Sequence, residues 1–249
     1  MTVDKLKTSV ADGTLAGGAR LDTKHPAPRG ELNLSVAEVR LEELKRLDFR
    51  APPVSGTLSA RIALAGQGHS LHEMLASANG TVSAVIPSGA MRAALAEAAS
   101  LDLAGALGIA AQSDKETHIR CGVASFDASD GVLTARTLLV DTDKALITGS
   151  GEIHMDSGAL DLSLRGNPKH VSLTMHSPVS IRGTLNHPEV RLNAGKVLAR
   201  GAAAAALGVV LTPVAAVLAY INPKVAHNAD CADLTARAQT APPEQPEAK

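Results

Sequence analysis

The sequence predicts a mainly β protein with accessory helices, an α+β fold built around an antiparallel sheet. Apolar and polar residues alternate with period two over many short stretches, which is typical of strands with one buried face. Turn-forming pairs such as Asp-Gly and Asn-Pro separate these stretches by about ten residues, a spacing that favours antiparallel hairpins over parallel strands. Aromatic residues are 1% of the 249 residues and apolar residues are 45%, so the buried face is expected to be aliphatic.

Strands are expected from the beginning of the chain. The alternation is visible over 14–20 and 31–36. It resumes at Leu58, Ile62 and Leu64, which precede a glycine-containing turn. These segments predict a first group of strands whose aliphatic side chains share one face.

Three short helices are expected between the strands. The apolar spacing over 36–47 is helical rather than alternating. Ser70 and Glu73 have the spacing of a capping box, in which side chains satisfy the free amides at a helix start, so a helix is predicted over 70–77. An alanine- and leucine-rich stretch predicts a third helix over 91–111.

Residues 117–193 are predicted to form a series of short strands joined by turns. The stretch 179–193 contains two alternating segments, and Pro188 is placed in the turn between them. Throughout the predicted sheet the aliphatic side chains face inward. The inward residues are Leu58, Ile62, Leu64, Leu160, Leu162, Leu164, Val171, Leu173, Ile181 and Leu185.

Composition divides the chain into three regions. Residues 1–196 carry the sheet pattern, and residues 197–226 form an apolar, alanine-rich helical segment. Within this segment 202–221 has no charge and is about long enough to span a bilayer. Its alanines, glycines and Pro213 favour a bent helix or helical hairpin that lies on the sheet or at a membrane surface. Residues 227–249 are predicted to be a polar tail with a disordered, proline-containing end.

Composition also argues against several classes of function. The net charge of -1 and the scarcity of rings do not favour binding to nucleic acid, which uses basic surfaces and aromatic stacking. His69 and His72 lie three residues apart, but the local sequence supplies no third or fourth ligand for zinc. No nucleophile elbow, HExxH motif or phosphate loop occurs. We therefore expect neither an enzyme nor a bound cofactor.

The two cysteines, Cys121 and Cys231, exclude a cysteine-rich zinc site and CxxC redox chemistry. The residues alone leave two interpretations open, a single long-range disulfide and two separate thiols. A disulfide requires an oxidising compartment such as a bacterial periplasm. The first residues lack the apolar run of a secretory signal, so either the chain stays in the cytoplasm or its targeting segment lies upstream in a longer protein.

The regular alternation predicts a sheet with one apolar face, which other parts of the protein or a ligand must shield from water. One interpretation is an ordinary core, in which helices from the 91–111 and 202–221 segments lie on the sheet. The other is an open apolar trough that accepts acyl chains, an elongated version of an apolar pocket with few polar groups.

The chain contains several short motifs in a characteristic order. They lie at 54–71, 75–82, 88–90, 125–132, 149–153 and 178–190, followed by the pair Asp230-Cys231. This order resembles the C-terminal part of the AsmA family, envelope proteins of Gram-negative bacteria that are related to TamB. Each motif is weak by itself, and their order makes the match specific over about residues 30–235.

The resemblance implies a periplasmic protein anchored to the inner membrane, with a long, curved sheet that forms a hydrophobic groove. Members of the family are tied to outer-membrane homeostasis and are thought to conduct phospholipids between membranes. This chain shows neither the N-terminal anchor helix of the family nor most of its upstream domain, so a C-terminal fragment is the simplest expectation.

On this basis the inward residues are expected to line a groove that binds phospholipid, and 202–221 to lie at its end or at a membrane surface. The alternative function is a scaffold that assists assembly of outer-membrane proteins by adding its edge strands to a partner. The resemblance also favours the disulfide between Cys121 and Cys231, which would hold the tail against the sheet.

Overall fold

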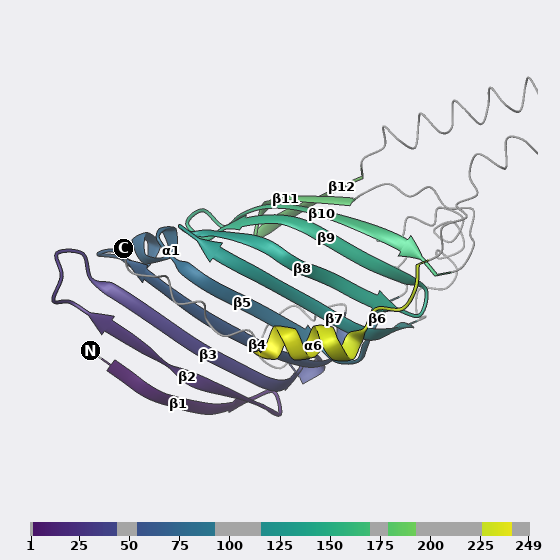
Figure 1. Ribbon diagram of the computed structural model, residues 1–249, viewed down its shortest axis with the longest axis horizontal. Helices are drawn as coiled ribbons and strands as arrows, with labels where there is room; N and C mark the ends of the chain where they lie inside the picture. Colours follow the sequence, from purple (N-terminus) through teal and green to yellow (C-terminus); the bar gives the residue numbers. More distant parts are fainter. Residues whose placement is uncertain (1, 44–53, 93–115, 170–178, 193–225, 241–249) are drawn as a thin grey trace, which may run out of the picture.

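A computed structural model describes residues 2–43, 54–92, 116–169, 179–192 and 226–240. Twelve strands form a single antiparallel sheet, which confirms the predicted mainly β architecture (Figure 1). The strands are β1 (Thr2–Val10), β2 (Gly13–Asp22), β3 (Arg29–Arg40), β4 (Val54–Gln67), β5 (Asn79–Ile86), β6 (Gly89–Arg92), β7 (Glu116–Ser129), β8 (Val132–Thr142), β9 (Ala145–His154), β10 (Ala159–Pro168), β11 (Val179–Thr184) and β12 (His187–Leu192).

The sheet follows the chain almost without crossovers. Its order is β1-β2-β3-β4-β5-β7-β8-β9-β10-β11-β12, and the short β6 pairs with both β4 and β7 beside this path. Two helices are described, α1 (Leu71–Ala76) between β4 and β5, and α6 (Cys231–Thr240) after the last strand. The order of the strands agrees with the meander that regular turn spacing predicts.

The register separates the side chains into two faces. In an antiparallel pair, directly opposed residues point to the same side of the sheet. The face that carries Leu64 and Leu160 is called the inner face, and the opposite one the outer face. One row of opposed inner residues crosses the sheet from β2 to β10 without a break: Ala19, Leu32, Leu64, Gly80, Ala128, Leu133, Ile153 and Leu160.

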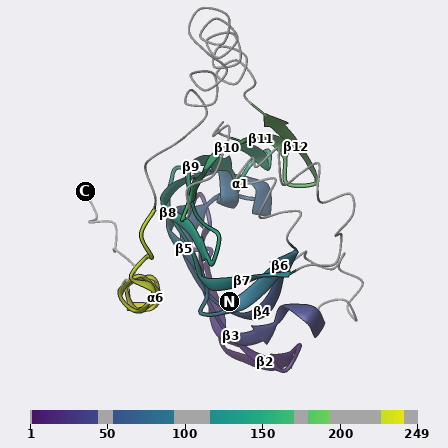
Figure 2. The ribbon, with the colours of Figure 1, turned by 90° about the vertical axis from the view of Figure 1, so that its right-hand side faces the viewer.

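The sheet is curved, and its two faces carry different helices (Figure 2). The helix α6 lies outside the curve, where Leu234 and Ala238 pack on Val85 and Val123 of the outer face. The helix α1 lies on the inner side, where Met74 covers Gly30 and Gly66. A Cβ atom added at Gly30 would lie 3.1 Å from the sulfur of Met74, so glycine lets the helix approach the sheet. The inner face is therefore the concave one.

The predicted helix over 70–77 is confirmed as α1. Ser70 has extended backbone angles, and its hydroxyl accepts a hydrogen bond of 3.1 Å from the amide of Glu73. The Glu73 carboxylate accepts one of 2.7 Å from the amide of His69, so two amides at the helix start are satisfied. The capping residues therefore determine where this six-residue helix begins.

Replacing Ser70 with alanine is expected to destabilise α1 by about 1 kcal/mol, because the amide of Glu73 loses its acceptor. Amide hydrogen exchange of residues 73–76 should become several-fold faster. The control is His72→Ala, which changes an exposed residue of the same helix that has no capping role. Equal amide exchange rates in Ser70→Ala and His72→Ala would contradict the prediction that the Ser70 cap stabilises α1.

The predicted helix over 36–47 is wrong in its described part. Residues 36–40 belong to β3, and Leu41 to Glu43 form a single 3-10 turn. The register shifts between Val36 and Val39, and Glu38 has a positive φ of 55°. This β-bulge places two aliphatic residues three positions apart on one face, a spacing that imitates a helix. Residues 44–47 lie outside the described part.

The start of the predicted helix over 91–111 is also wrong, because Met91 and Arg92 belong to β6. Met91 is opposite Val54 on one side and Thr117 on the other. Both partners are distant in the sequence, so pairing outweighs the local preference for a helix. Residues 93–111 lie outside the described part, as do 197–225 of the apolar helical segment.

The hairpin of β11 and β12 differs slightly from the prediction. Its turn consists of Leu185 and Asn186, and Pro188 is in β12, opposite Gly183. Among the described strands β12 is an edge, where the missing amide of a proline is tolerated. The tail predicted from 227 contains the helix α6. Asp230 supplies the missed signal, since its carboxylate caps the amide of Asp233 at 3.1 Å.

Candidate functional site

The inner face of the sheet is mainly aliphatic in its described part, with Phe126 and Thr8 among the exceptions. The inner positions of β4, β5, β9 and β10 hold glycine, proline or aliphatic residues and no charged side chain. Most of these residues are half-buried rather than sealed, and Leu6 near one edge is 45% exposed. An aliphatic, partly accessible, concave surface can hold hydrocarbon through burial of apolar area.

The structure brings the predicted inward residues of distant segments onto this one face. Leu58, Ile62 and Leu64 lie on β4, and Leu160, Leu162 and Leu164 lie on β10. Ile181 of β11 is directly opposite Leu162. All seven are half-buried.

Three predicted lining residues are not part of the described inner face. Leu185 is in the turn after β11 and is 61% exposed, because the strand ends one residue earlier. Val171 and Leu173 lie outside the described residues.

Glycines let the aliphatic side chains of the inner face meet. Gly149 of β9 is opposite Leu138 of β8 and Leu164 of β10. A Cβ atom at position 149 would lie 2.5 Å from a methyl carbon of Leu138 and 2.7 Å from one of Leu164. The two leucines therefore close over the glycine and form a continuous hydrocarbon surface across three strands.

The outer face is polar by contrast. Opposed outer residues on β3, β4, β5, β7, β8, β9 and β10 form the row Asn33, Ala63, Thr81, Asp127, Thr134, Glu152 and Asp161. Ion pairs span neighbouring strands, with Arg136 held by Asp127 and Arg182 by Asp161. These exposed pairs contribute little stability but keep the outer face hydrated.

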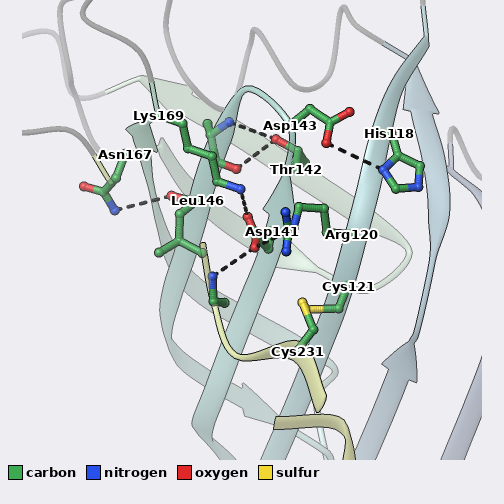
Figure 3. A network of polar contacts seen from close by, with 12 residues as sticks. His118, Arg120, Cys121, Asp141, Thr142, Asp143, Leu146, Asn167, Lys169 and Cys231 are labelled. Atoms are coloured by element: carbon green, nitrogen blue, oxygen red, sulfur yellow. Dashed lines mark hydrogen bonds and ion pairs between the residues drawn. A yellow bond between two sulfur atoms is a disulfide. The ribbon is translucent and has the colours of Figure 1, made fainter. Parts of the chain in front are cut away.

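The C-terminal segment is fixed to the outer face by a disulfide. Cys121 of β7 and Cys231 at the start of α6 are bonded, with their Cα atoms 5.8 Å apart (Figure 3). The hydroxyl of Ser83 donates a hydrogen bond of 2.9 Å to the carbonyl of Ala238 at the other end of α6. The helix is thus attached at both ends, and it covers the outer rather than the inner face.

A buried carboxylate reinforces this attachment. Asp141 of β8 is 0% exposed and accepts a hydrogen bond of 3.0 Å from the amide of Ala229. The ammonium of Lys169 and the guanidinium of Arg120 are its ionic partners, the latter at 3.4 Å (Figure 3). No local sequence pattern indicates this role of Asp141, because its partners come from three distant parts of the chain.

Two carboxylates in the described part of the chain have a lowered pKa. Hydrogen bonds from the backbone amides of Lys24 and Ser157 lower the pKa of Asp22 and Asp156, respectively. Asp22 is the half-buried last residue of β2, and Asp156 is exposed in a turn. Within the described ranges no group of three or more His, Cys, Asp or Glu residues could hold a metal ion. The helices described here, α1 and α6, are too short to cross a membrane.

The model of the AsmA family matches residues 1–138. The AsmA family protein YhjG of Escherichia coli (strain K12) is 28% identical over 232 residues, which cover 93% of this chain and 34% of that protein. The chain therefore spans about a third of the length of this relative. No solved structure matches the chain. Because the family match covers more than half of the sequence and agrees with the curved sheet, the chain belongs to the AsmA family, which fits a protein of the bacterial envelope.

Proposed function

We propose that the inner face binds the acyl chains of phospholipids and provides a path along which they move between membranes. The observation that carries this proposal is the row of aliphatic residues and one glycine that runs from Leu32 to Leu160 on the concave side, most of them half-buried. Burial of apolar surface stabilises such a complex by about 25 cal/mol per Å². Charged inner side chains would oppose it, and the inner positions of β4, β5, β9 and β10 have none.

We also propose where the protein is located and that it catalyses no reaction. The disulfide between Cys121 and Cys231 supports an oxidising compartment, for which the periplasm is the simplest candidate in an envelope protein. In the full-length protein we expect attachment to the inner membrane. The function is non-enzymatic, and it maintains the outer membrane by supplying lipid.

A pair of neighbouring substitutions tests the lipid-binding face. Leu162→Glu places a carboxylate on the inner face between Gly151 and Ile181, where an acyl chain would have to desolvate it. The phospholipid that co-purifies with the chain, measured by extraction and mass spectrometry, should fall by at least about tenfold.

The matched control is Ser163→Glu on the same strand, because Ser163 points to the outer face opposite Ser150 and Ser180. It adds the same charge and should leave the lipid content unchanged. Equal lipid content in the wild type and both variants would contradict binding at the inner face, as would a lipid-free wild type.

The edges of the sheet favour a second candidate function. Within the described part of the chain, β1 and β12 each pair on one side only. An unpaired edge can receive a strand from another protein. A scaffold for outer-membrane protein assembly would be lipid-free and would capture unfolded β-barrel precursors. Leu162→Glu would leave this capture unchanged, because Leu162 is not on an edge strand.

A further inference from the structure

The outer face contains a cavity of about 770 Å³ beside α6. It lies on the side of the sheet opposite the proposed lipid path. Small side chains of neighbouring strands form its floor, and Leu234, Arg237 and Ala238 of α6 form one wall. The floor residues include Ala16, Ser35, Ala63, Thr81, Ser83, Ser125 and Thr137. Since the disulfide and Ser83 hold α6 in place, the wall of the cavity is fixed to its floor.

The charged residues that line this cavity are all arginines. They are Arg61 of β4, Arg136 of β8 and Arg237 of α6, and none of the described lining residues is acidic. Asp127 and Asp233 neutralise two of them from outside the lining, by pairing with Arg136 and Arg237. The neighbouring hollow along β3 and β4 includes Glu38, which forms no described ion pair with Arg61. These three arginines and their two carboxylate partners leave one net positive charge.

Several hydrogen-bond donors around the cavity are not used by these ion pairs. Arg61 has no ionic partner among the described residues. Arg237 pairs with Asp233 through Nε at 2.9 Å, which leaves its terminal nitrogens unpaired in the described part of the chain. The hydroxyls of Ser35, Thr81, Ser125 and Thr137 lie on the same floor, and none donates to a described protein group.

We propose that this cavity binds a phosphate-bearing ligand. Guanidinium groups match phosphate geometry through paired hydrogen bonds. Three arginines and several hydroxyls offer more donors than the two oxygens of a carboxylate can accept, whereas a phosphate presents three or more oxygens. Leu234 and Ala63 would contact the carbon portion that carries the phosphate. The proposal is independent of lipid binding at the inner face, because the two sites use opposite faces of the sheet.

Calorimetric titration of the oxidised 249-residue chain tests this site. The probes are inorganic phosphate, glycerol 3-phosphate and dihexanoyl phosphatidic acid below its micelle concentration. Arg61→Gln should weaken binding by about tenfold or more, the effect of removing one charge-assisted hydrogen bond. The control is Arg165→Gln, which removes the same charge from an exposed residue of β10 that does not line the cavity. It should leave the affinity unchanged.

The probes also separate two sources of the phosphate. Similar affinity for all three supports a site for the phosphate group itself. Tighter binding of phosphatidic acid supports a lipid headgroup if Arg61→Gln weakens that binding and the inner-face variant Leu162→Glu does not. Absence of binding by all three overturns the proposal, and so does an equal loss in both variants, which would indicate general charge attraction. Arg61→Lys keeps the positive charge but cannot form the paired hydrogen bonds of a guanidinium group. Its affinity should lie between those of the wild type and Arg61→Gln, and its circular dichroism spectrum should match that of the wild type.

Discussion

The Cys231→Ser variant is expected to unfold with a free energy about 4–5 kcal/mol below that of the oxidised wild type. The disulfide joins residues separated by 110 positions, and in the chain-entropy model a closed loop of this length removes that much conformational entropy from the unfolded state. Denaturant unfolding followed by far-ultraviolet circular dichroism measures the difference. In the same variant, amides of α6 should exchange faster, because the start of the helix is released from β7.

Reduction provides the control for this prediction. The wild type in a reducing agent should match Cys231→Ser, and the variant should not respond to the reducing agent. Equal unfolding midpoints for the variant and the oxidised wild type would contradict the prediction, because the hydrogen bonds of Asp141 to Ala229 and of Ser83 to Ala238 are lost on unfolding and cannot constrain the unfolded chain.

Asp141→Ala should reduce the free energy of unfolding by about 3–5 kcal/mol. The substitution leaves the ammonium of Lys169, whose side chain is only 8% exposed, without its carboxylate. Removing one partner of a buried ion pair costs far more than the pair contributes, because the remaining charge stays desolvated. The amide of Ala229 also loses its acceptor. Denaturant unfolding at neutral pH is the measurement.

Asp143→Ala is the matched control, two residues away. Asp143 is 62% exposed and lies 3.6 Å from a nitrogen of His118. An exposed pair of this kind contributes at most about 1 kcal/mol. Comparable losses in the two variants would mean that the burial of Asp141 does not determine its contribution.

The sheet itself was largely predictable from the sequence, because alternation is a local signal. Each strand such as β10 shows its aliphatic face within six residues, and turn pairs such as Asp130-Gly131 mark the hairpins. The helices predicted over 36–47 and 91–111 are wrong in their described parts, because contacts with distant strands override or interrupt the two-residue period of a strand. The bulge between Val36 and Val39 imitated a helix, and the pairing of Met91 with two distant strands outweighed local helix preference.

The candidate site was predictable only in part. The alternation identifies which leucines share a side of each strand, but it does not say what covers them. Asp230 could have signalled α6, yet only two residues of this helix, Leu234 and Ala238, pack in the cluster with Val85 and Val123, and they are too few for a clear helical stripe. The cavity beside α6 was missed, because its arginines come from β4, β8 and α6 and are brought together only by folding.

The sequence by itself determined the two-sided character of the protein, since a period of two places every second side chain on one face whatever the strand's neighbours are. Only the tertiary structure decided which face curves inward, that α6 is attached to the polar outer face, and that Asp141 is buried against Lys169 and Ala229. The physical reason is distance along the chain. Asp141 and Ala229 are 88 residues apart, and such contacts depend on the path of the whole sheet rather than on any local pattern.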